Sequence, residues 1–185
     1  MSYSQPDFYK FNSDSVELAK YAASEFKHSK NIKVLDLCCG CGVVGLEFYK
    51  DHHNISRLDF LENQKEFKSH IERNSTSLEC SSEILLENYH QFITSEKYDL
   101  ILCNPPYFKS GHGRVSPNMQ RQKCRTFKDG DIEGLVSFLS SSLAQNGVAF
   151  IVHREDLSII DSRFELCSKV SGADLFRFIL NVDRS

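Results

Sequence analysis

Short apolar runs alternate with amphipathic segments along most of this chain, and this alternation constrains the fold more than any other feature. Apolar runs of strand length that are separated by helical patterns are typical of parallel strands joined by crossover helices. The expected strands are Lys33–Cys38, Ile55–Leu61, Glu83–Glu87, Tyr98–Cys103, Gly147–His153, Glu165–Val170 and Asp174–Val182. The expected helices are Asp14–Lys27, Val43–Asp51, Asn63–Asn74 and Asp131–Gln145, with a short one near Glu155–Asp161.

The short connection between the last two expected strands determines how they pair. Only a few residues around Ser171 and Gly172 separate them, so they can join only as an antiparallel hairpin. We therefore expect an α/β fold with a seven-stranded, mostly parallel sheet, an antiparallel C-terminal hairpin and helices on both faces. A chain of this length buries enough surface for one core, so residues 1–185 are expected to form a single domain. Ser13 or Asp14 can cap the first helix.

Composition excludes several other classes of protein. The chain is 41% hydrophobic and 25% charged, which is typical of a folded globular domain and not of a disordered one. It has no apolar run of about 18 residues and no signal-peptide pattern at its start, so we expect a cytoplasmic protein with no membrane partner. Seven cysteines are an odd number, and reduced thiols are expected. The net charge of -3 disfavours a general binder of nucleic acids or membranes.

A glycine-containing turn follows the first expected strand. Asp36 and Leu37 end that strand, and Cys38, Gly40 and Gly42 lead through small residues into a helix. Such glycines let the backbone approach a nucleotide-like ligand, while the helix start offers unpaired N–H groups to it. An acid about twenty residues later, at the end of the second strand, can accept hydrogen bonds from ribose hydroxyls, and Glu62 stands there. Plain packing of the helix on the sheet is the alternative interpretation of the glycine turn alone.

The fourth expected strand runs directly into Asn104, Pro105, Pro106 and Tyr107. Consecutive prolines end the strand and restrict the backbone, so the Pro105 carbonyl and the Asn104 amide oxygen can point at one position. A planar nitrogen such as the amino group of adenine is a poor nucleophile, because its lone pair is delocalised. If both its N–H groups donate to these oxygens, the nitrogen can pyramidalise towards a methyl carbon without a strong base. Tyr107 would stack on the planar substrate. The alternative is a turn that only ends the strand.

Taken together, the glycine turn, Glu62 and the Asn-Pro-Pro-Tyr sequence resemble the class I S-adenosylmethionine-dependent methyltransferases, which have a Rossmann-like fold. The usual turn of that family reads Asp-x-Gly-x-Gly-x-Gly, and this chain has Cys38 in place of the first glycine. That replacement is tolerable if Cys38 keeps a negative φ. The resemblance implies S-adenosyl-L-methionine as cofactor, with Glu62 at its ribose and Asp36 acting on its methionine end through the loop.

The same resemblance assigns further residues to the cofactor. Asn63 would lie beside the adenosine, and Asn88 after the third strand would hydrogen-bond the adenine in place of the commoner Asp. The full set of expected cofactor residues is Phe11, Ser13, Asp14, Asp36, Cys38, Gly40, Gly42, Glu62, Asn63, Asn88 and Asn104. Residues 1–30 are expected to supply a helix and a segment that covers the cofactor.

Two segments of the chain resemble one particular group within these methyltransferases. Residues 5–16 and the stretch from Tyr107 to Arg125 are similar to the bacterial tRNA adenine-N6 methyltransferases that modify a valine tRNA beside the anticodon. In that group Phe11, Ser13 and Asp14 would line the methionine end of the cofactor site. The implied reaction is methylation of the N6 amino group of an adenine in tRNA. Two alternatives stay open: a glutamine-amide methyltransferase that acts on a translation factor, and a catalytically silent RNA-binding module with the same fold.

Residues 104–130 show neither helical nor strand period, and we expect them to form a substrate loop. From Phe108 to Lys128 this segment has no Asp or Glu. Its basic residues can contact phosphates, and its aromatic residues can engage an unstacked base. The expected RNA-binding residues are Lys109, Arg114, Arg121, Lys123 and Arg125. An ordinary solvated basic loop is the alternative.

The clustered cysteines do not indicate a metal site. Cys38 and Cys41 have the spacing of half a zinc knuckle, but no second Cys or His pair accompanies them at knuckle distance. We expect no metal, and we interpret Cys38, Cys39 and Cys41 as small side chains suited to a tight loop. The expected partner is tRNA, and the expected oligomeric state is a monomer or a weak dimer.

Overall fold

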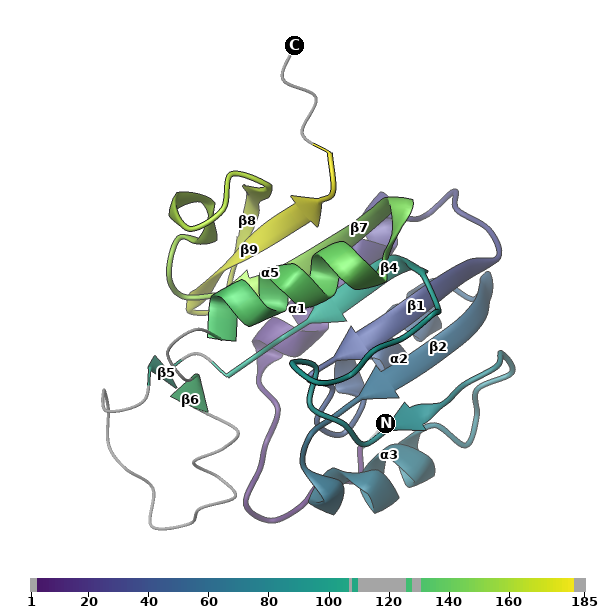
Figure 1. Ribbon diagram of the computed structural model, residues 1–185. Helices are drawn as coiled ribbons and strands as arrows, with labels where there is room; N and C mark the ends of the chain where they lie inside the picture. The colour runs from purple at the N-terminus through teal and green to yellow at the C-terminus, as the bar shows by residue number, and fades with distance from the viewer. Residues whose placement is uncertain (1–2, 107, 110–125, 128–130, 182–185) are drawn as a thin grey trace.

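The computed structural model describes residues 3–106, 108–109, 126–127 and 131–181. Its main sheet has seven strands in the order β3-β2-β1-β4-β7-β9-β8 (Figure 1). The strands of this sheet are β1 (Ile32–Leu37), β2 (Ile55–Leu61), β3 (Ile84–Leu85), β4 (Tyr98–Cys103), β7 (Leu143–His153), β8 (Phe164–Val170) and β9 (Ala173–Ile179). The helices are α1 (Ser13–Glu25), α2 (Val43–Asp51), α3 (Lys68–Asn74) and α5 (Asp131–Ser142), with the 3-10 turns η1 (Lys65–Phe67) and η2 (Leu157–Ile159).

The pairing of the strands confirms the expected sheet. β1 pairs in parallel with β2 and β4, and β7 pairs in parallel with β4. β9 runs antiparallel to both β7 and β8, so the C-terminal hairpin is also confirmed. The chain moves outward from β1 to β3 and then returns to β4 on the other side of β1, which makes the ends of β1 and β4 a topological switch point. Ligands of open α/β sheets bind beyond the carboxyl ends of strands at such a point.

Alternating residues of the buried strands make a core on each face of the sheet. Val34, Leu58 and Leu100 pack with α1 and α2, whereas Leu35 and Ile101 pack with α5. Figure 1 shows the same arrangement, with α5 on one face and with α1 and α2 on the other. Both faces of the central strands are therefore covered, which explains why their sequences are apolar throughout. No helix of the described residues is long and apolar enough to cross a membrane.

Several element boundaries differ from those expected. The third strand has only two residues, and the helix expected over residues 63–74 begins as η1 before it continues as α3. The helix expected to reach Gln145 ends at Ser142, because Leu143 already pairs with Tyr98 of β4. Tertiary pairing therefore overrides the helical pattern there. Two short parallel strands, β5 (Phe108–Lys109) and β6 (Thr126–Phe127), lie inside the segment expected to be a loop.

Gly147 allows β7 to pass close to β4. A Cβ atom at this position would lie 2.6 Å from the Tyr98 carbonyl oxygen and 3.0 Å from the Ala144 nitrogen. Both neighbours are backbone atoms, so they cannot rotate away. We expect Gly147→Ala to lower the free energy of unfolding by about 1–3 kcal/mol, the usual cost of overpacking. Urea unfolding measures the change. The exposed neighbour Gln145, changed to Ala, is the control, and an equal effect of both substitutions would contradict this account.

Candidate active site

The side chain of Asn104 is held at the carboxyl end of β4. Cys103, the last residue of the strand, is fully buried, Asn104 is half-buried and Pro105 is buried. The Asn104 Nδ2 donates hydrogen bonds to Ser15 Oγ at 2.8 Å and to Asp14 Oδ1 at 3.3 Å. Because the amide is planar and its nitrogen faces α1, its oxygen points away from α1. Asn104 thus presents an acceptor at the edge of the sheet where the parallel strands end.

The first turn of α1 differs from the expected helix start. Its N-cap is Asn12, which makes no side-chain cap hydrogen bond, so the expectation that Ser13 or Asp14 caps the helix is wrong. The Asp14 carboxylate instead accepts from the Ser15 backbone N–H at 2.7 Å and from Asn104. The sequence did not indicate Ser15 as a residue of the site. A buried amide next to two prolines needs an acceptor for its nitrogen, but nothing in the local sequence indicates which hydroxyl supplies it.

The turn after β1 uses left-handed backbone at three positions. The φ angles are +57° at Cys38, +54° at Gly40 and +79° at Gly42, which is also the N-cap of α2. The condition that Cys38 keeps a negative φ is therefore not met. A residue other than glycine in this region costs on the order of 1 kcal/mol, and the surrounding structure must offset that cost. The abrupt change of direction from β1 into α2 requires this backbone whichever residue stands there.

Glu62 ties the end of β2 to this turn. The carboxylate is 7% exposed; its Oε2 accepts from the Gly40 N–H at 2.9 Å and its Oε1 from the Gln64 N–H at 2.8 Å. Glu62 therefore lies against the glycine turn, and its expected contact with a ribose stays a prediction. Burial raises the pKa of Glu62 even though backbone N–H groups favour its charged form. The two carboxylate oxygens have four lone pairs in all, which leaves the carboxylate able to accept from a ligand hydroxyl as well.

Asp36 is a buried acid beneath the same turn. Its side chain is fully buried, and Oδ2 accepts from the Gly45 N–H of α2 at 2.8 Å. Oδ1 has no hydrogen-bond partner among the described residues. Burial raises the pKa of Asp36 well above its usual range, and the nearby Glu62 raises it further. A buried carboxylate oxygen without a partner favours a ligand that brings a positive charge or N–H groups.

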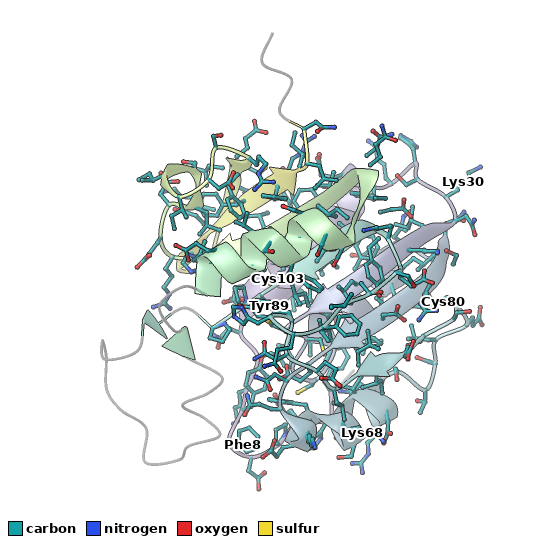
Figure 2. All side chains as sticks on the ribbon, viewed as in Figure 1. Phe8, Lys30, Lys68, Cys80, Tyr89 and Cys103 are labelled. Atoms are coloured by element: carbon teal, nitrogen blue, oxygen red, sulfur yellow. The ribbon has the colours of Figure 1, made fainter. Side chains whose placement is uncertain are left out.

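The N-terminal segment lies over the turn. The Tyr9 hydroxyl is 3.4 Å from the position that a Cβ on Gly40 would take. The Tyr9 ring packs edge-on against the Phe67 ring, with 5.2 Å between the ring centroids. Phe8 packs on the same Phe67 ring. Figure 2 shows Phe8 at the same end of the molecule as Lys68, the first residue of α3. Further along, Phe11 is half-buried and Ser13 is exposed. The start of the chain therefore covers part of the edge where β1, β2 and β4 end.

Asn88 follows β3, and its side chain accepts a hydrogen bond within the turn of residues 88–90. Its Oδ1 accepts from the His90 N–H at 3.0 Å, so an interaction with adenine depends on the remaining lone pair. The ring of the next residue, Tyr89, stacks on the His90 ring with 4.4 Å between the ring centroids. It also packs edge-on against Phe138 of α5, with 6.0 Å between the centroids. Figure 2 shows Tyr89 near Cys103, close to the end of β4. Asn63, in contrast, is exposed. The expected contacts of Asn63 and Asn88 with adenosine stay predictions.

The remaining expected site residues lie mostly outside the described part of the chain. Tyr107, Arg114, Arg121, Lys123 and Arg125 fall there, and only the backbone of Lys109 is described, in β5. Among the described residues, no group of three or more His, Cys, Asp and Glu side chains could hold a metal ion.

Asp36 should make stability depend on pH. Because its folded pKa is raised, the stability from its protonated form is fully present below the ordinary value of about 3.9 and is lost as pH rises through the folded pKa. We expect Asp36→Asn to gain stability relative to the unsubstituted protein as pH rises from about 4, by at most about 1.4 kcal/mol per pH unit, until the folded pKa is passed. Urea unfolding across that range measures the difference. A difference independent of pH would contradict the raised pKa.

Comparison with known proteins agrees with this geometry. The chain is 27% identical over 149 residues to a tRNA1(Val) (adenine(37)-N6)-methyltransferase of Proteus mirabilis, covering 77% of this chain and 56% of that protein. It is 26% identical over 155 residues to the Haemophilus influenzae protein of the same name, and the match covers 79% of this chain and 62% of that protein. The chain thus spans little more than half the length of these curated relatives.

A solved structure shares the fold at low sequence identity. A 16S rRNA N2 methyltransferase of T. thermophilus, in complex with AdoMet and guanosine, superposes with a TM-score of 0.68 at 16% identity. The match covers 93% of this chain and 44% of that one. Residues 17–176 match the family described as "Methyltransferase small domain", a range that includes most of α1, the glycine turn, Glu62 and Asn104. The chain therefore belongs to the methyltransferase small domain family.

Proposed function

We propose that this chain transfers a methyl group from S-adenosyl-L-methionine to the N6 amino group of an adenine in tRNA. The observation that carries the proposal is the orientation of the Asn104 amide, whose nitrogen is bound by α1 and whose oxygen points away from it. The names of the curated relatives support the same reaction and substrate. A tRNA substrate agrees with the expected cytoplasmic location.

The residues at the turn fit this cofactor. S-adenosyl-L-methionine supplies an electrophilic methyl group on a positively charged sulfonium. Glu62 can accept from ribose hydroxyls while it keeps its bonds to the turn, and the Oδ1 of Asp36, which has no partner among the described residues, can accept from a donor or interact with a positive charge of the ligand. Gly40 and Gly42 expose backbone without side chains. Neither acid has a cationic partner among the described residues, and burial without one is unfavourable, so a cationic ligand at this edge relieves that cost.

Asn104 and Pro105 would act on the substrate nitrogen. The Asn104 amide oxygen and the Pro105 carbonyl oxygen accept its two N–H groups, which bends the nitrogen out of the plane of the base and frees its lone pair. The nitrogen would gain positive charge as its bond to the methyl carbon forms and the bond between the methyl carbon and the sulfonium sulfur breaks, so acceptors that bind the charged form more strongly lower the barrier. The rest of the cofactor would leave as a neutral thioether, and the methylated nitrogen would then lose a proton to water. No general base is required before methyl transfer. Tyr107 would hold the ring by stacking.

The basic segment after β4 favours RNA over protein as substrate. Its six Lys and Arg side chains between Phe108 and Lys128 follow directly on the Asn-Pro-Pro-Tyr sequence, with no acid among them. Phosphates attract such a segment, whereas a glutamine side chain in a protein does not need it. We therefore propose residues 104–130 as the substrate loop, with Lys109, Arg114, Arg121, Lys123 and Arg125 at the phosphates.

The decisive experiment is transfer of labelled methyl groups to unmodified total tRNA, with a protein lysate in parallel, followed by nucleoside mass spectrometry. We expect N6-methyladenosine in the tRNA, and a decrease of at least about 100-fold in rate with Asn104→Ala, because an acceptor for the developing charge is removed. Cofactor affinity, measured by calorimetry, should change little. Label in protein alone would favour the glutamine-amide reaction, and label in neither would contradict an active enzyme.

The substrate loop can be tested by its salt dependence. We expect Arg121→Ala with Arg125→Ala to weaken tRNA binding and to reduce the slope of log K against log salt by about 1 for each phosphate that is no longer neutralised. Lys27→Ala with Lys30→Ala is the matched control, since both lysines are exposed and Figure 2 shows Lys30 far from Phe8 and the active edge. Equal slopes for the two double variants would show that the loop does not bind the phosphates.

A further inference from the structure

We propose that Asp14 and Ser15 are positioning residues that determine which end of the Asn104 amide meets the substrate. This inference rests on the proposed function, in which Asn104 must accept hydrogen bonds. An asparagine amide has an oxygen and a nitrogen of nearly the same size but of opposite hydrogen-bonding character. A rotation of half a turn about the last side-chain bond exchanges the two. With the nitrogen towards the substrate, two donors would face each other and the amino group could not be held.

The contacts of the amide decide between these two orientations. Its Nδ2 donates to Ser15 Oγ at 2.8 Å and to Asp14 Oδ1 at 3.3 Å. A hydroxyl can both donate and accept, so Ser15 alone would tolerate either orientation. A carboxylate only accepts, and the reversed amide would bring two oxygens together beside Asp14. Asp14 therefore selects the orientation, while Ser15 provides the shorter bond that fixes the position.

The burial of Asp14 and Ser15 strengthens their preference for one orientation of the Asn104 amide. Asp14 and Ser15 are each 3% exposed, so water does not readily replace either bond, and electrostatic interactions are stronger there than at the surface. The Ser15 backbone N–H also donates to Asp14 Oδ1 at 2.7 Å and holds the carboxylate in place. A negative acceptor on the amide nitrogen draws electron density towards the amide oxygen, which strengthens that oxygen as an acceptor.

The rest of α1 supports this pair rigidly. Leu18, Ala19 and Ala22 are fully buried against the sheet, so the first turn of the helix cannot shift relative to β4. Upstream, Tyr9 lies against Gly40 of the cofactor turn. The helix that orients Asn104 is therefore continuous with the segment that covers the proposed cofactor site. Support of a reacting side chain by rigid, packed neighbours is what a positioned site requires.

Ser15→Ala tests the positioning role. We expect it to lower kcat for tRNA methylation by at least about tenfold, towards the roughly 100-fold loss that a misplacement of about 1 Å can cause. Cofactor affinity should stay within about twofold, because the interaction acts on the methyl acceptor. Ser15→Thr keeps the hydroxyl and should recover most of the rate. Ser24→Ala, an exposed serine of the same helix, is the matched control and should leave the rate unchanged.

A second readout does not depend on the substrate. In the free protein, the two side-chain N–H signals of Asn104, assigned by their disappearance in Asn104→Ala, should exchange slowly with water and shift when Ser15→Ala or Asp14→Asn is introduced. Asp14→Asn also adds a donor beside the amide, so both orientations become possible and kcat should fall at unchanged cofactor affinity. Thermal unfolding confirms that each variant is folded.

The outcomes separate this inference from the proposed function. If the unsubstituted protein does not methylate tRNA but the Asn104 signals respond to both substitutions, the proposed function fails and the positioning role stands. If the protein is active and Ser15→Ala and Asp14→Asn leave kcat and the Asn104 signals unchanged, the positioning role is overturned. A decrease of cofactor affinity equal to the decrease of kcat would also overturn it, because the pair would then belong to the cofactor site.

Discussion

The register between β1 and β4 places Leu37 opposite Cys103, so the residues that follow the two strands start side by side. One strand continues into the glycine turn and the other into Asn104 and the two prolines. The proposed reaction depends on this pairing, because it would bring a methyl donor and a methyl acceptor to adjacent strand ends. Helices on both faces bury the strands and prevent them from sliding past each other.

Two buried acids give this edge its electrostatic character. Asp36 and Glu62 lie under and beside the turn, and burial raises the pKa of both. Such groups are unfavourable for a protein without a ligand, and they become favourable when a cationic ligand lies near them. A third buried acid, Asp14, accepts a hydrogen bond from the Asn104 amide nitrogen at the neighbouring strand end. Asp36 and Glu62 thus lie beside the proposed cofactor site, and Asp14 lies behind the proposed methyl-acceptor site.

The sequence predicted the fold because the fold depends on local signals, whereas its assignments of residues to cofactor and substrate stay predictions. Apolar runs between Lys33 and Val170 located the strands, and the turn chemistry around Gly40 and Gly42 located the proposed cofactor site. Other details depended on distant residues. β7 starts at Leu143 because Tyr98 pairs with it, and the Asp14 carboxylate in the first turn of α1 accepts from Asn104 after β4. No local propensity contains either interaction.

By itself the sequence determined the order of strands and helices, the antiparallel C-terminal hairpin, the glycine turn with its acid, and the family, since each follows from residue type and spacing along the chain. Only the tertiary structure decided that Cys38 has a positive φ and that Ser15 and Asp14 bind the amide of Asn104. These features depend on contacts between residues up to about ninety positions apart, and hydrogen-bond direction between such residues is set by packing in three dimensions.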